Sequence, residues 1–124
     1  MANNKILIVD DDAQIRLGLN ARLRASGYET SFAEDGVGVM SAALREKPDL
    51  ILLDIGLPGG DGFLVMKRLK ANSNLAHIPV IVLTAREPET NEKRALEAGA
   101  VAFFQKPVEN DELLFAIGSA ISPT

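Results

Sequence analysis

Short apolar runs alternate with amphipathic segments along the whole chain, and this alternation constrains the fold more than any other feature. Five runs are expected to form strands, at 5–9, 28–33, 49–54, 80–83 and 101–104. The segments that follow them have apolar residues spaced by three or four, which is typical of helices. Strands that alternate with helices favour right-handed crossovers and a parallel sheet with helices on both faces. The sequence therefore predicts a doubly wound α/β fold, a five-stranded parallel sheet with five helices.

The helices can be placed from their caps and their apolar stripes, and are expected at 13–26, 35–47, 62–71, 88–98 and 111–121. Asp12 is placed to cap the first helix and Gly27 to end it. The spacing of apolar residues predicts an inward stripe in four of the helices. These stripes are Ile15, Leu19 and Leu23; Val37, Met40 and Leu44; Phe63, Met66 and Leu69; and Leu113, Ile117 and Ile121. The 28–33 strand is less apolar than the others, so it is expected at a sheet edge.

Four of the five expected strands end on a polar side chain that could carry chemistry. Asp10 and Asp11 follow the first strand, Asp54 ends the third, and Thr84 and Lys106 follow the fourth and fifth. Because parallel strands share their carboxyl edge, where ligands bind in open α/β sheets, these residues are expected to meet. Singly, each has a plainer explanation as a helix cap, a turn residue, a strand former or a surface charge. Their conjunction at one edge favours a site with Asp54 as its reactive group.

The residue types limit the chemistry of such a site. Carboxylates crowded into one cleft disfavour ionisation unless a cation compensates for their charge. Because only oxygen ligands are on offer, the matching ion is Mg²⁺ before any transition metal. Lys106 would add a positive charge and Thr84 a hydroxyl donor, both suited to a phosphoryl group. Since a carboxylate nucleophile such as Asp54 can form an acyl phosphate, phosphoryl transfer is the favoured reaction.

The composition argues against several other classes of function. With 124 residues the chain is expected to form a single domain, over residues 1–124. It has no Cys, which excludes disulfides and Cys-ligated zinc, and its one histidine, His77, stands alone. The net charge of -4 argues against direct binding of nucleic acid. No apolar run approaches the roughly 20 residues that span a bilayer, and no signal peptide is evident, so a cytoplasmic location without a membrane partner is expected.

Five short segments occur in an order and at a spacing that are typical of one protein family. They are ILIVDDD (6–12), DIGLPGGDG (54–62), LTA (83–85), AGA (98–100) and KP (106–107). On these segments the chain resembles the receiver domains of two-component response regulators, chemotaxis regulators among them, over essentially its whole length. The resemblance implies a single receiver domain with a flavodoxin-like strand order, 2-1-3-4-5. It also implies a phosphoprotein that acts as a signalling switch in a two-component system or phosphorelay.

The resemblance implies how the phosphoryl group would be received. Asp54 would accept it from a phosphohistidine of a sensor histidine kinase or a phosphotransfer protein. Mg²⁺ would be held by Asp10, Asp11, Asp54 and the backbone carbonyl of Gly56. The protein would catalyse only its own phosphorylation and its own slow dephosphorylation, and so would not be a metabolic enzyme.

The resemblance also implies how the modification would be reported. Thr84 and Lys106 would bind the phosphoryl oxygens, and the Lys106–Pro107 peptide bond would be cis. Phe103 takes the place of the family's aromatic switch residue, where Tyr is common, and is equally well explained as a core aromatic. Phosphorylation would rearrange the surface formed by the fourth helix, the fifth strand and the fifth helix. That surface would control an unidentified partner or a fused output domain.

Two further expectations concern the margins of the site and of the last helix. Gly56 and Arg86 stand two residues after Asp54 and Thr84, at positions that in this family influence hydrolysis of the acyl phosphate. Leu114 and Phe115 lie outside the inward stripe of the last helix. They are explained either as core residues or ordinary exposed apolar residues, or as a contact with a partner or with a second copy in a phosphorylation-dependent homodimer.

Other functions stay open on the sequence alone. A degenerate receiver that serves only as a docking module would share the fold, although the complete Asp, Thr and Lys set argues against it. A Mg²⁺-dependent aspartyl phosphohydrolase typically carries its nucleophile after the first strand in an Asp-x-Asp-x-Thr/Val pattern, whereas the acidic triplet 10–12 is followed here by Ala13 and Gln14. A flavin or nucleotide carrier would need a glycine-rich phosphate loop after that strand, and none follows it. The sequence closes on Ser122, Pro123 and Thr124 with no output domain. We therefore expect either a separate partner or a place within a longer regulator or hybrid kinase.

Overall fold

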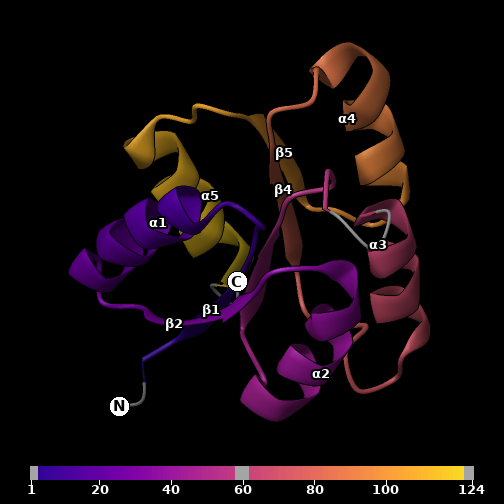
Figure 1. Ribbon diagram of the computed structural model, residues 1–124, viewed down its shortest axis with the longest axis horizontal. Coiled ribbons are helices and arrows are strands. Elements are labelled where there is room, and N and C mark those ends of the chain that lie inside the picture. The colour runs from indigo at the N-terminus through magenta and orange to yellow at the C-terminus, as the bar shows by residue number, and fades with distance from the viewer. Residues whose placement is uncertain (1–2, 58–61, 122–124) are drawn as a thin grey trace.

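A parallel sheet of five strands in the order β2-β1-β3-β4-β5 forms the centre of the molecule (Figure 1). The computed structural model describes residues 3–57 and 62–121. The strands are β1 (Lys5–Val9), β2 (Glu29–Ala33), β3 (Leu50–Leu53), β4 (Val80–Thr84) and β5 (Ala102–Gln105). Every neighbouring pair is parallel. The expected fold class is therefore confirmed, including the edge position of the least apolar strand.

Five helices cover the two faces of this sheet. They are α1 (Ala13–Ala25), α2 (Gly36–Glu46), α3 (Gly62–Ala71), α4 (Pro88–Glu97) and α5 (Asn110–Ile121). Figure 1 shows α1 and α5 on one face and α2, α3 and α4 on the other. Each face has its own apolar core, because successive side chains of a strand point to opposite sides. In β1, Ile6 and Ile8 pack on the α1 and α5 side, and Leu7 and Val9 on the other.

The central strands are apolar on both faces, as expected for strands covered by helices on each side. All four residues of β3 and all five of β4 are buried. β2 is mostly half-buried or exposed, because it pairs only with β1. Helix α1 begins where expected, since the Asp12 side chain accepts hydrogen bonds from the backbone N–H groups of Gln14 and Ile15. It is followed by Gly27 with φ of 93°, a left-handed conformation that glycine adopts at little cost.

The expected inward stripe of α2 is wrong at two of its three positions; the third, Met40, is half-buried and packs against the core as expected. Val37 is 75% exposed and Leu44 is 45% exposed, and the helix turns Val39, Ala42 and Ala43 into the core instead. The small alanine side chains let the helix backbone approach the sheet closely, and this rotation places the larger residues Val37 and Leu44 at the surface. Sequence spacing alone does not report how closely a helix packs.

The other stripes have buried centres, with exceptions near the helix ends. Phe63, Met66 and Leu69 of α3 are buried, as are Leu19 and Leu23 of α1 and Leu113 and Ile117 of α5. Ile15 and Ile121 are half-buried and pack against the same core as α1 and α5, as does Leu114. Phe115 is exposed.

Parts of two expected segments fall outside the described residues. Pro58, Gly59, Gly60 and Asp61 of the DIGLPGGDG segment do so, as do Ser122, Pro123 and Thr124. No helix in the described part of the chain has the length and apolar character needed to span a bilayer.

Two glycines offer opposite tests of the packing. A Cβ on Gly62, the first residue of α3, would lie 2.3 Å from the Cα of Ile55, whereas a Cβ on Gly118 of α5 would meet nothing within 4 Å. We expect Gly62→Ala to lower the free energy of unfolding by about 3 kcal/mol through overpacking. Gly118→Ala is expected to raise it by about 0.5–1 kcal/mol, since alanine favours a helix interior over glycine. Urea unfolding of both variants measures this, and an equal effect of the two would contradict the close approach of α3 to Ile55.

Candidate functional site

The expected strand-end residues do meet at one edge of the sheet. Asp10 follows β1, Asp54 follows β3, Thr84 ends β4 and Lys106 follows β5. The register of the parallel ladders sets these strand ends side by side: Val9 pairs with Leu53, and Thr84 pairs with Gln105. The backbone N–H of Asp54 also donates to the carbonyl of Val9, at 3.0 Å. The sheet itself therefore positions the cluster.

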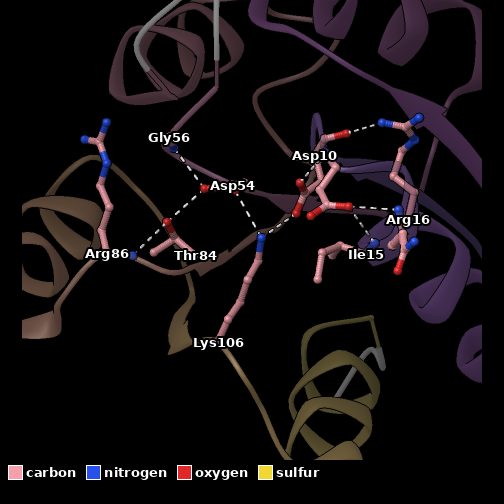
Figure 2. A network of polar contacts seen from close by, with 10 residues as sticks. Asp10, Ile15, Arg16, Asp54, Gly56, Thr84, Arg86 and Lys106 are labelled. Atoms are coloured by element: carbon pink, nitrogen blue, oxygen red, sulfur yellow. Dashed lines mark hydrogen bonds and ion pairs between the residues drawn. The ribbon is translucent and has the colours of Figure 1, made fainter.

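Lys106 lies between two buried carboxylates (Figure 2). Its Nζ lies 2.6 Å from Oδ2 of Asp10 and 3.1 Å from Oδ2 of Asp54. Asp10 is 3% exposed and Asp54 is 9% exposed, so neither charge is compensated by bulk water. The lysine ammonium therefore provides part of the charge compensation that two buried carboxylates require.

The second oxygen of Asp54 is held by neutral donors. The Thr84 hydroxyl, which is almost completely buried, donates to Oδ1 of Asp54 at 2.8 Å. The backbone N–H of Gly56 donates to the same oxygen at 2.9 Å. One carboxylate oxygen thus faces Lys106 and the other faces Thr84 and Gly56, which fixes the orientation of the Asp54 side chain (Figure 2).

Three carboxylates at this edge fit a hard divalent cation. Oxygens of Asp10, Asp11 and Asp54 lie within 4.8 Å of one another, and Asp11 is exposed while the other two are buried. An all-oxygen donor set with one open side suits Mg²⁺, which is usually bound by one or two carboxylates and keeps several waters. Asp12, the third acid of the triplet, does not join this set because its side chain caps α1.

The protonation state of Lys106 follows from the same contacts. Burial lowers the pKa of its ammonium group, but the hydrogen bond to Asp10 and the charges of Asp54 and Asp10 raise it by more, so the net pKa lies above the ordinary lysine value. Lys106 is therefore charged at neutral pH. The stabilisation that follows from a raised lysine pKa is complete below the ordinary value and is lost only as the pH rises through the raised one.

The structure places the other expected residues around this cluster. The guanidinium of Arg86 approaches Gly56: a Cβ on Gly56 would lie 3.5 Å from Nε of Arg86. The backbone N–H of Arg86 donates to the Thr84 hydroxyl at 3.3 Å. The Lys106–Pro107 peptide bond is cis. Phe103 is half-buried and packs against the core on the α2, α3 and α4 side.

Arg16 of α1 is a contact residue that the sequence reasoning missed. Its Nη1 donates to the backbone carbonyl of Asp10 at 2.7 Å, and its Nη2 lies 3.5 Å from the carboxylate of Glu34. The spacing of six residues from Asp10 carries no recognisable signal, because an arginine on the first turns of a helix is usually a solvated residue. Only the path of the chain after β1 shows that the Arg16 side chain turns back toward Asp10.

The arrangement favours phosphoryl chemistry over other reactions. An oriented carboxylate, a cation and a hydroxyl donor converge on one point beside a candidate Mg²⁺ site, and phosphoryl transfer requires mainly such positioning and charge neutralisation. His77, the one histidine of the sequence, precedes β4 and therefore lies at the opposite edge of the sheet. It takes no part in the cluster.

Comparison with known proteins gives a consistent result over nearly the whole chain. Residues 6–118 match the family described as the response regulator receiver domain. The response regulator PleD of Caulobacter vibrioides is 45% identical over 113 residues, which are 90% of this chain and 24% of that protein. The chain thus spans about a quarter of that relative's length. Sporulation initiation phosphotransferase F of Bacillus subtilis is 39% identical over 117 residues, which are 94% of this chain and 93% of that protein.

A solved structure gives the same result for the fold. The receiver domain of a sensor histidine kinase from Pseudomonas aeruginosa superposes with a TM-score of 0.88 at 31% identity, over 97% of this chain and 98% of that one. That structure was solved with a magnesium ion coordinated in its active site cleft.

The charge balance of the cluster can be tested by removing its cation. With divalent ions chelated, Lys106→Met is expected to lower the free energy of unfolding by about 3 kcal/mol, because Asp10 and Asp54 stay buried without a partner. Saturating Mg²⁺ is expected to restore part of that loss, since it binds only the folded state. Urea unfolding with chelator and with Mg²⁺ measures both effects.

Lys5→Met is the matched control, because it removes a lysine whose pair with Glu46, at 3.3 Å, is partly open to solvent. Its expected cost is at most about 1 kcal/mol. Equal losses in the two variants would contradict the compensating role of Lys106.

Proposed function

Because the chain belongs to the response regulator receiver domain family, we propose that it is a signalling switch controlled by phosphorylation of Asp54. The family is one of two-component response regulators, whose receiver domains interact with histidine kinases or phosphotransfer proteins. The observation that carries the assignment of Asp54 is its set of partners, Lys106 on one carboxylate oxygen and Thr84 on the other. No other carboxylate of the described residues combines this burial with these two donors.

Phosphorylation would replace the contacts of Asp54 with contacts to the phosphoryl group. An oxygen of the Asp54 carboxylate attacks the phosphorus of a phosphohistidine, the P–O bond forms, and the P–N bond breaks to release the imidazole of the donor. The Thr84 hydroxyl and the Lys106 ammonium, already within hydrogen-bond distance of Asp54, then bind phosphoryl oxygens. Their contacts thereby report the modification to β4 and β5.

The metal requirement follows from the charge of this reaction. Asp10, Asp11, Asp54 and the backbone carbonyl of Gly56 would hold Mg²⁺. When bound, the ion would neutralise charge on the phosphoryl oxygens. The proximity of Asp10, Asp11 and Asp54 supports this assignment.

A groove beside Lys106 supports an approach of the donor protein from the α1 side. It has a volume of about 390 Å³ and is lined mainly by α1 and by the segment after β5, with Ile15, Leu19, Lys106, Pro107 and Val108 among its residues. Apolar side chains of a donor helix can pack there while its phosphohistidine reaches Asp54. The surface formed by α4, β5 and α5 would change on phosphorylation and act on the target. Phe103 lies there, between the core and the surface. The target of that surface is a partner or an output domain whose identity we do not assign.

The first test is intact-mass analysis after incubation with acetyl phosphate and Mg²⁺. The wild-type chain is expected to gain one phosphoryl group, because Asp54 is oriented and a small acyl phosphate needs no docking surface. Asp54→Asn and a chelated wild-type sample are expected to gain none.

Three outcomes separate the alternatives. A phosphoryl group that persists in Asp54→Asn would contradict the assignment of the acceptor. No adduct from acetyl phosphate or from a phosphohistidine donor would favour a docking module without phosphorylation. Steady turnover of a small phosphate ester would indicate a phosphohydrolase.

The second test concerns Arg86, which stands beside Gly56 at the mouth of the site. Arg86→Ala is expected to shorten the half-life of the phosphorylated protein severalfold, because the mouth opens to water and a nearby cation is lost. The decay of the phosphorylated mass with time measures this. Arg68→Ala, which removes an exposed arginine of α3, is the control. An unchanged half-life in Arg86→Ala would remove Arg86 from the proposal.

A further inference from the structure

We propose that Arg16 is a positioning residue that holds the Asp10–Asp11 loop in the conformation that binds Mg²⁺. The inference rests on the proposed function, since it concerns the same metal site. It adds a residue of α1 that does not touch the metal and that acts through the backbone of the loop.

Arg16 reaches the loop with a well-formed hydrogen bond. Its Nη1 lies 2.7 Å from the carbonyl oxygen of Asp10 (Figure 2). Its Nη2 lies 3.5 Å from Oε1 of Glu34. The Arg16 side chain is only 17% exposed, whereas that of Glu34 is 72% exposed. The stronger and less solvated contact of the guanidinium is therefore the one to the loop.

The peptide unit that Arg16 binds is the one that leads into Asp11. The backbone N–H of Asp10, on the N-terminal side of the residue, donates to the carbonyl of Ala33 at 3.2 Å. The side chain of Asp10 is itself tied, because Oδ1 accepts from the N–H of Asp12 and Oδ2 from Lys106. Asp10 is thus held by both its backbone and its side chain.

Asp11 is held differently. Its side chain is exposed and forms no hydrogen bond or ion pair with the described residues. The direction of its carboxylate therefore depends on the backbone, and among the residues that the structure describes, Arg16 alone donates from its side chain to the preceding carbonyl, that of Asp10. Loss of Arg16 would release that carbonyl and allow Asp11 to leave the other two ligands.

A positioning role and a purely electrostatic role of Arg16 predict opposite changes in the affinity for Mg²⁺ when Arg16 is removed. Removing a cation near a metal site should strengthen binding of Mg²⁺ if only charge matters. Removing a residue that orients a ligand should weaken it, and loss of an outer partner of a metal site typically costs about 10–100-fold in affinity. The sign of the change therefore separates the two roles.

The experiment is a calorimetric titration of the unphosphorylated full chain with Mg²⁺ alone. Arg16→Met is expected to bind about tenfold more weakly than the wild type. Arg24→Met is the matched control: Arg24 is on the same helix and carries the same charge, and within the described residues its guanidinium donates only to the side chains of Asn20 and Thr30. Its affinity for Mg²⁺ is expected to equal or slightly exceed that of the wild type. Glu34→Gln, which leaves the Arg16 contact to Asp10 in place, is expected to stay within about twofold of the wild type.

Thermal unfolding by circular dichroism confirms that each variant is folded at the titration temperature. If Arg16→Met is not, Arg16→Lys replaces it, because it keeps the charge but its shorter side chain ends short of the position from which Nη1 of Arg16 donates to the Asp10 carbonyl; a threefold or greater loss is then expected. An unchanged or tighter affinity in the Arg16 variant, or an equal loss in Arg24→Met, would overturn the inference and leave the proposed function intact. No binding of Mg²⁺ by the wild type would overturn the proposed function, and this inference with it.

Discussion

The whole site depends on one physical constraint, the need to balance carboxylates that the sheet forces together. Parallel strands end at a common edge, so the acids after β1 and β3 meet whatever their mutual repulsion. Lys106, delivered by the neighbouring end of β5, lies between Asp10 and Asp54 and provides a compensating charge. A divalent cation would add to that compensation from the open side, where Asp11 is exposed. The negative charge of the site can therefore be balanced by Lys106 alone or by Lys106 together with a divalent cation. A site with more than one charge state is a suitable basis for a switch.

The acidic triplet after β1 shows how three identical side chains take different tasks. Asp12 is committed to the first turn of α1, Asp10 is buried against Lys106, and Asp11 stays free to face solvent. The backbone decides among them, because the strand ends at Val9, just before Asp10, and the helix begins immediately after Asp12. Arg16 then closes the same turn from the far side. A loop of this kind is short enough for its capping, its burial and its ligand geometry to depend on one another.

Much of the fold was predictable because it rests on periodicity and on strand ends. The strands, the two-sided sheet and the meeting of Asp10, Asp54, Thr84 and Lys106 all follow from the order of apolar and polar residues. The face of α2 was not predictable, because the rotation of a helix is set by how closely its alanines let it approach the sheet. Arg16 was missed for a related reason: its role depends on the direction in which the chain turns after β1. Local sequence patterns predict the secondary structure of a segment, whereas tertiary contacts determine which face of that segment packs against the core.

The close packing of Gly62 on Ile55 has a mechanical consequence for the site. The first residue of α3 rests on the main chain immediately after Asp54, and its N–H donates to the carbonyl of Ile55 at 3.3 Å. The proposed acceptor, Asp54, therefore precedes a residue whose main chain is packed closely against α3. Across the site, α4 follows Thr84 by a short connection and buries only Ala95 among its residues. If Asp54 is phosphorylated as proposed, the added group would meet close packing on the α3 side and a sparsely buried helix on the α4 side. We therefore expect any displacement to go toward β4 and α4, where less packing opposes it.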